Sequence, residues 1–92
     1  MAAFTQQEAL ERLTHLPGWQ IEAGELVRNL QFKDFREALG FVNRVGEAAE
    51  TAGHHPDIDI RYNRVRLALL THDAGGLTSK DFGLAAKVNE LV

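Results

Sequence analysis

Residues 57–70 read DIDIRYNRVRLALL, and this stretch decides the fold. Apolar residues recur at every second position in two runs, which is the pattern of half-buried β-strands. The apolar positions are Ile58, Ile60 and Tyr62 in the first run and Val65, Leu67 and Leu69 in the second. Asn63 and Arg64 lie between the runs and are expected to form a two-residue turn. The stretch therefore predicts a β-hairpin.

Three segments outside this hairpin begin with a helix-capping pattern. In each, a Thr or Asp is followed three residues later by a Glu or Asp, so both side chains can bond to unpaired backbone N–H groups. The pairs are Thr5 and Glu8, Asp34 and Glu37, and Thr78 and Asp81. The chain is therefore expected to start helices at three places.

The segment 34–52 has apolar residues at helical spacing on one face. The predicted buried stripe consists of Phe35, Ala38, Leu39, Val42, Val45 and Ala49. Gly53 is expected to end this helix, because glycine readily adopts the left-handed backbone conformation of a helix terminus.

Segments 19–22 and 25–32 predict two further strands on either side of a turn at Ala23 and Gly24. The expected order is α-β-β-α-β-β-α. The fold class is α+β, with a four-stranded antiparallel sheet that carries three helices on one face, where every apolar stripe is buried. At 92 residues, positions 1–92 are expected to form one domain.

Composition narrows the classes of function. Hydrophobic residues make up 45% of the chain and charged residues 25%, as in ordinary globular proteins. The ten Lys and Arg residues are scattered and the net charge is -3, which argues against direct binding to nucleic acid. The absence of cysteine excludes thiolate nucleophiles and cysteine zinc sites. The longest apolar run, residues 67–70, is too short to cross a membrane, and a cytoplasmic location is expected.

Histidines provide the main functional signal. The expected turn at 63–64 sets a strand register that brings His72 beside His55. His54 is adjacent in sequence, and Glu50 precedes it by four residues near the end of the second helix. The pattern therefore predicts a carboxylate and three imidazoles at one end of the sheet.

Such a cluster permits three interpretations. Imidazole titrates near pH ~6.5, so neighbouring histidines can act as acid and base in neutral solution. Three histidines with a carboxylate can also form a zinc site, although the spacing is none of the common pairs. A purely structural role is the third interpretation.

The spacing of these residues resembles that of a known family. The motif comprises Glu50, His54, His55, Pro56, Tyr62, His72 and Asp81, and further similar positions are Gly18 and Trp19, residues 32–35, Thr71, Gly76 and Leu77, and Leu84 and Ala85. With these residues the chain resembles the pterin-4a-carbinolamine dehydratases from about residue 17 onward.

The resemblance implies a fold of the same type and a homodimer or homotetramer. It implies dehydration of 4a-hydroxytetrahydrobiopterin to quinonoid dihydrobiopterin and water, as part of tetrahydrobiopterin recycling, without a cofactor or a metal. His54 and His72 are then expected to transfer protons, and His55 to grip the pterin as the third histidine of the catalytic set. The positions implied in substrate binding are Glu50, Pro56, Thr71, Asp73 and Asp81.

Three positions depart from the family pattern. Gly53 replaces an acidic residue, Ile58 an aromatic residue and Lys80 an arginine, and each change is expected to affect contacts with the pterin. In animals, similar proteins also bind a homeodomain transcription factor as its dimerisation cofactor, so such a partner follows only by analogy. A non-catalytic interaction protein and a histidine-rich zinc protein are the alternative functions.

Overall fold

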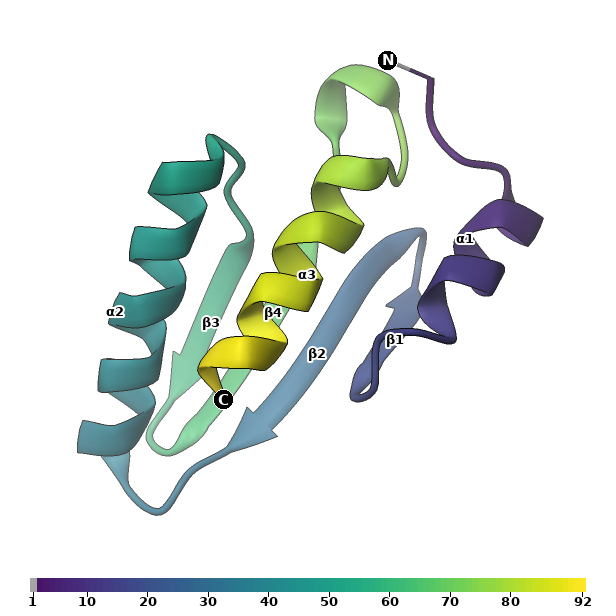
Figure 1. Cartoon of the computed structure of the whole chain (residues 1–92). Coiled ribbons are helices and arrows are strands. Elements are labelled where there is room, and N and C mark those ends of the chain that lie inside the picture. Colours follow the sequence, from purple (N-terminus) through teal and green to yellow (C-terminus); the bar gives the residue numbers. More distant parts are fainter. Residues whose placement is uncertain (1) are drawn as a thin grey trace.

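The order of helices and strands is the predicted one. The structure, a computed structural model, describes residues 2–92 (Figure 1). The elements are α1 (Gln6–Leu13), β1 (Trp19–Glu22), β2 (Glu25–Gln31), α2 (Phe35–Ala52), β3 (Asp57–Arg61), β4 (Arg64–Leu69), a 3₁₀ helix (His72–Ala74) and α3 (Ser79–Leu91). No helix within residues 2–92 has both the length and the apolar character needed to span a membrane.

The helices begin where the capping pattern predicts. Thr5 caps α1 and Thr78 caps α3, each with a complete capping box. The Asp34 side chain accepts a hydrogen bond from the N–H of Glu37 at 2.9 Å and caps α2. Gly53 ends α2 with φ of 64°, the left-handed conformation expected there.

The four strands form one antiparallel sheet in the order β1-β2-β4-β3. The β1–β2 turn lies at Ala23 and Gly24, whose φ values of 50° and 81° suit a tight hairpin. All three helices lie on the same face of the sheet (Figure 1). Between the helices and the sheet lies the core, which includes Leu26, Leu67 and Leu69 from the central strands.

The buried face of α2 differs from the predicted stripe. Ala38, Val45 and Ala49 are buried as expected, and Phe41 is buried with them. Phe35 and Leu39, by contrast, are 46% and 41% exposed. Apolar residues cover a wide arc of this helix, so the sequence alone did not show which part of the arc faces the core. Packing selects the buried part of the arc, because the ring centroids of Phe41 and Phe32 lie 5.0 Å apart.

The predicted register of the β3–β4 hairpin is wrong by two residues. Arg61 pairs with Arg64, so the turn consists of Tyr62 and Asn63. Asn63 is held at the end of the sheet, because its side-chain amide donates to the carbonyl of Phe32 at 2.8 Å and its own carbonyl accepts from the N–H of Phe32 at 2.8 Å. A shift of two residues leaves each side chain on its original face, so the apolar pattern did not distinguish the two registers.

Candidate active site

Four segments of the chain bring the predicted site residues to one end of the molecule. They are the end of α2, the loop into β3, the segment after β4 and the start of α3, which lie together at the top of Figure 1. Gly53 turns the chain out of α2, and the backbone N–H of His54 still donates to the carbonyl of Ala49 at 3.2 Å. His54 is therefore fixed close to the end of the helix.

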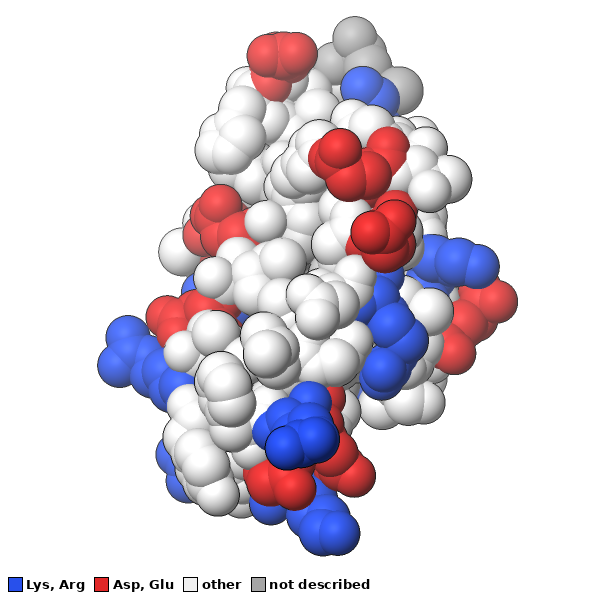
Figure 2. Space-filling view, turned by 90° about the vertical axis from the view of Figure 1, so that its left-hand side faces the viewer, with Lys and Arg blue, Asp and Glu red and all other residues white. Residues whose placement is uncertain are grey.

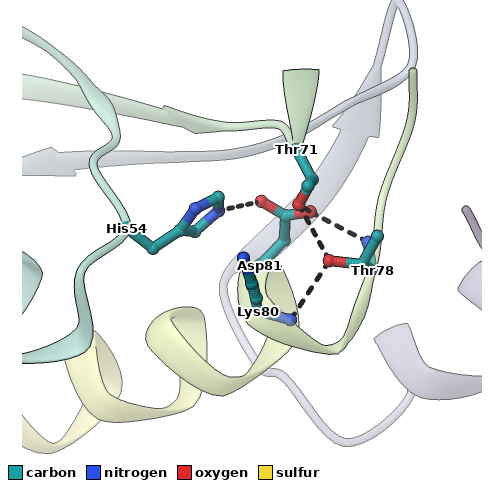
Figure 3. A network of polar contacts seen from close by, with 5 residues as sticks. All are labelled: His54, Thr71, Thr78, Lys80 and Asp81. Atoms are coloured by element: carbon teal, nitrogen blue, oxygen red, sulfur yellow. Dashed lines mark hydrogen bonds and ion pairs between the residues drawn. The ribbon is translucent and has the colours of Figure 1, made fainter. Parts of the chain in front are cut away.

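Asp81 is the centre of a polar network at this end (Figure 3). Its side chain is fully buried in the first turn of α3. One carboxylate oxygen, Oδ2, accepts from the N–H of Thr78 at 2.9 Å and from the hydroxyl of Thr71 at 2.7 Å. The other, Oδ1, lies 2.6 Å from Nε2 of His54. A buried carboxylate is costly unless it is hydrogen-bonded, and here both oxygens have partners.

The two threonines complete the network. The hydroxyl oxygens of Thr71 and Thr78 lie 2.8 Å apart, and the Thr78 oxygen also accepts from the N–H of Lys80 at 3.3 Å. Both threonines are buried. The His54 side chain is 12% exposed, so one edge of its ring meets the network while part of it reaches the surface. The arrangement fixes the orientation of an imidazole that solvent can still reach.

His55 and Glu50 form a second pair on the surface. Nε2 of His55 is hydrogen-bonded to Oε2 of Glu50, and their side chains are 61% and 75% exposed. An open cavity of about 400 Å³ lies beside this pair. Pro56 also lines it, and Val42 and Ile58 give it apolar walls. The cavity therefore combines a polar rim with the apolar surface that a flat ring system requires.

His72 and Asp73 are exposed at the start of the 3₁₀ helix. Within residues 2–92, neither side chain takes part in a hydrogen bond with another residue. The predicted contact between His72 and His55 rested on the incorrect register. The observed register, continued past β3 and β4, brings Thr71 toward His54 instead, and both of these side chains contact Asp81.

Of the site residues, the structure thus joins His54, Thr71 and Asp81 in one network and Glu50, His55 and Pro56 around one cavity. Among residues 2–92, no three or more His, Cys, Asp or Glu residues lie close enough to hold a metal ion. The zinc alternative therefore lacks a ligand set in the described part of the chain.

Sequence reasoning missed the contact of the Thr78 hydroxyl with Thr71 and the contact between Asp81 and His54. The resemblance implies that Asp81 binds substrate, and its spacing from Thr78 predicts a helix cap. The cap is present, because Oδ2 accepts from Thr78, but Oδ1 remains free to bind the imidazole. A correct hairpin register was the signal that could have placed His54 beside Thr71.

Comparisons with known proteins identify the family. The family model described as Pterin 4 alpha carbinolamine dehydratase matches residues 2–91. The chain belongs to this dehydratase family. A relative from Acidobacterium capsulatum is 60% identical over 92 residues, which are all of both chains. One from Chloroflexus aurantiacus is 54% identical over 92 residues, which are 100% of this chain and 99% of the relative. Both carry the name "Putative pterin-4-alpha-carbinolamine dehydratase".

Solved structures agree with the fold. A crystal structure described as a transcriptional coactivator/pterin dehydratase from Brucella melitensis superimposes with a TM-score of 0.92 at 37% identity, covering 97% of each chain. A pterin dehydratase-like protein described as a RuBisCO assembly factor in the alpha-carboxysome has a TM-score of 0.65 at 22% identity, covering 79% of this chain and 84% of that one. The second likeness shows the fold alone.

Proposed function

We propose that this chain, as one domain over residues 1–92, removes water from a 4a-hydroxytetrahydropterin by histidine acid–base catalysis. One observation carries the proposal: a buried carboxylate holds His54 at the end of the molecule where His55 and Glu50 border an open cavity. Membership in the dehydratase family supports the choice of substrate.

The reaction requires two proton transfers. The hydroxyl group on C4a needs a proton to leave as water, and the proton on N5 must be removed so that the C4a–N5 double bond of the quinonoid dihydropterin can form. Two imidazoles supply a donor and an acceptor near neutral pH, and each contributes about 10²–10⁴-fold. We assign proton transfer to His54 and His72.

The cavity beside α2 is the proposed binding site for the pterin ring. The carboxylate of Glu50 can accept hydrogen bonds from the amino and N–H groups of the pterin, and the ring of His55 can hold its edge. Pro56, Val42 and Ile58 offer apolar contacts to the flat ring. In cells that make a 4a-hydroxytetrahydrobiopterin, the reaction would serve to recycle tetrahydrobiopterin.

Two of the roles that the resemblance implied are changed in this proposal, and a third is kept. Thr71 and Asp81 are engaged with each other and are buried, so they position His54 rather than contact the pterin. Asp73 is exposed beside His72 and is kept as a substrate-binding residue.

A direct assay of dehydration, with 4a-hydroxytetrahydrobiopterin generated in the cuvette, tests the function. His54→Ala and His72→Ala are expected to lose about 10²–10⁴-fold in turnover. His15→Ala is the matched control, because His15 is exposed just beyond α1 and should be silent. Full activity in both His54→Ala and His72→Ala contradicts the proposal. Loss of the parent activity with excess chelator points to metal chemistry instead.

We also propose that the chain forms a symmetric homodimer or homotetramer. Strands β1 and β3 are both free sheet edges, and unpaired edges invite association. Figure 2, in which α2 faces the viewer, shows a band without charged side chains along this face. The exposed Phe35 and Leu39 belong to α2. Light scattering at micromolar concentration should return at least twice the mass of a single chain, and the mass of one chain would refute oligomerisation.

A further inference from the structure

The hydrogens in the Asp81 network can be assigned by counting donors. The backbone N–H of Thr78 can only donate, and it donates to Oδ2 of Asp81. The hydroxyl of Thr71 gives its one hydrogen to the same oxygen. The contact between the two hydroxyls then requires Thr78 to donate to Thr71. The Thr78 oxygen in turn accepts from the N–H of Lys80. Every hydrogen in this series of hydrogen bonds is directed toward Asp81, as an ionised carboxylate requires.

An ionised carboxylate accepts hydrogen bonds and donates none. The short contact of 2.6 Å between Oδ1 of Asp81 and Nε2 of His54 therefore places the proton on Nε2. In a neutral imidazole the other nitrogen, Nδ1, then carries the lone pair. The network fixes not only the orientation of the ring but also its tautomer.

The nitrogen Nδ1 of His54 is also accessible. Within residues 2–92 the ring of His54 has no hydrogen-bond partner other than Asp81. The only buried side-chain nitrogen or oxygen in this range without a partner is Nε of Arg28, so Nδ1 of His54 is not sealed from solvent. An unpaired acceptor that solvent can reach, on the residue next to His55 at the cavity, is the arrangement that a general base requires.

We infer that Asp81 is a positioning residue that holds His54 in its Nε2-protonated tautomer, so that Nδ1 is the base of the reaction. The inference rests on the proposed function. The N5–H bond of the pterin breaks and an Nδ1–H bond forms on His54. The electron pair left on N5 forms the C4a–N5 double bond as the C4a–O bond breaks, and the hydroxyl leaves as water with a proton from a second imidazolium. The Asp81 carboxylate stabilises the imidazolium that forms at His54, which then releases its proton to solvent.

The pair formed by His55 and Glu50 does not fix a tautomer in this way. Both His55 and Glu50 are mostly exposed, so water competes for the imidazole and the ring is free to exchange tautomers. The assignment of acid and base therefore follows from burial. The buried carboxylate fixes His54 as the base, and the solvent-exposed imidazole of His72 supplies the proton for the leaving hydroxyl.

The substitution Asp81→Asn tests the inference. The asparagine oxygen can still accept from Thr71 and Thr78, which keeps the helix cap and directs the amide NH₂ group toward His54. Nε2 must then accept, so the proton moves to Nδ1 and the tautomer is reversed. Two-bond ¹H–¹⁵N correlation spectra of the imidazole should show Nε2–H in the parent protein and Nδ1–H in the variant. Turnover should fall about 10²–10⁴-fold with a nearly unchanged melting temperature. Glu50→Gln is the control, and it should leave the His54 tautomer unchanged.

Several outcomes would overturn the inference. An Nδ1–H tautomer for His54 in the parent protein refutes it, and that measurement requires neither a folded variant nor activity. A reversed tautomer in Asp81→Asn with unchanged turnover refutes the role of Nδ1 as the base. A parent protein that shows Nε2–H at His54 but fails to accelerate dehydration contradicts the proposed function, and leaves the assignment of the tautomer to Asp81 intact.

Discussion

Replacing Thr71 by Val removes one hydroxyl group from the buried network while keeping the shape of the side chain. The change deletes the donor to Asp81 at 2.7 Å and the contact with the Thr78 hydroxyl at 2.8 Å. Thr71 is 6% exposed, so water cannot easily replace either bond. The Asp81 carboxylate keeps its bonds to Thr78 and His54 but loses a partner on Oδ2.

The expected cost follows from the two bonds. A hydrogen bond to a charged group contributes about 1.5–3 kcal/mol, and one between neutral groups about 0.5–1.5 kcal/mol. Thr71→Val should therefore lose about 2–4 kcal/mol of the free energy of unfolding. For a domain of this size, 1 kcal/mol corresponds to about 4–8 °C in melting temperature. The melting temperature should therefore fall by about 10–30 °C.

Thermal unfolding followed by circular dichroism measures the effect. Thr71→Ser keeps the hydroxyl group and should lose only about 1 kcal/mol for the missing methyl group. Thr51→Val is the matched control, because Thr51 is exposed on α2 and makes no hydrogen bond with other residues in 2–92; its stability should change by no more than about 0.5 kcal/mol. If Thr71→Val and Thr51→Val unfold at the same temperature, the network does not contribute as described.

Two further predictions concern stability. Phe41→Ala should lose about 3–5 kcal/mol of the free energy of unfolding in urea, because Phe41 is fully buried. Phe35→Ala, at 46% exposure, should lose at most about 1 kcal/mol at the same protein concentration. The reverse order would support the buried stripe predicted from the sequence. The pKa of Glu8 is lowered, first because its carboxylate accepts a hydrogen bond from the backbone N–H of Thr5 at 2.8 Å, and second because the Thr5 side chain lies beside it in the cap. This stabilisation is present above the ordinary glutamate pKa of ~4.3 and is lost as the pH falls through the lower pKa of the folded state. The difference in melting temperature between the parent and Glu8→Gln should therefore disappear in acid. A difference that is the same at pH ~7 and pH ~2 argues against the capping role.

The sequence predicted those parts of the fold that depend on local chemistry. The three helix starts were correct because a Thr or Asp followed by Glu or Asp three residues later satisfies backbone groups within a single turn. The turn at Ala23 and Gly24 was correct for a similar reason, since Gly24 accepts a positive φ without strain.

The errors arose where tertiary contacts decide between local alternatives. Two registers of the β3–β4 hairpin bury the same side chains, and the bonds between Asn63 and Phe32 select the observed one. The buried arc of α2 depends on packing against the sheet, which places Phe41 rather than Phe35 inside. Neither contact has a signature at short sequence distance.

The candidate site shows the same division. Spacing and resemblance together identified His54, His55 and Glu50, and the structure brings each of them into a polar pair. The partner of His54 was not predicted, because Asp81 is 27 residues away in sequence and reaches it only through the packing of α3. The resemblance could name Asp81 as a site residue but could not say that its carboxylate would face the imidazole.

The central claim is that this chain accelerates the loss of water from a 4a-hydroxytetrahydropterin. The most direct measurement is the rate at which this compound disappears, followed by stopped-flow absorbance with and without the parent protein at neutral pH. The account predicts saturable acceleration over the spontaneous reaction by the parent protein, and its near loss in His54→Ala while His15→Ala keeps the parent rate. A parent protein that folds as described and leaves the spontaneous rate unchanged would contradict the claim.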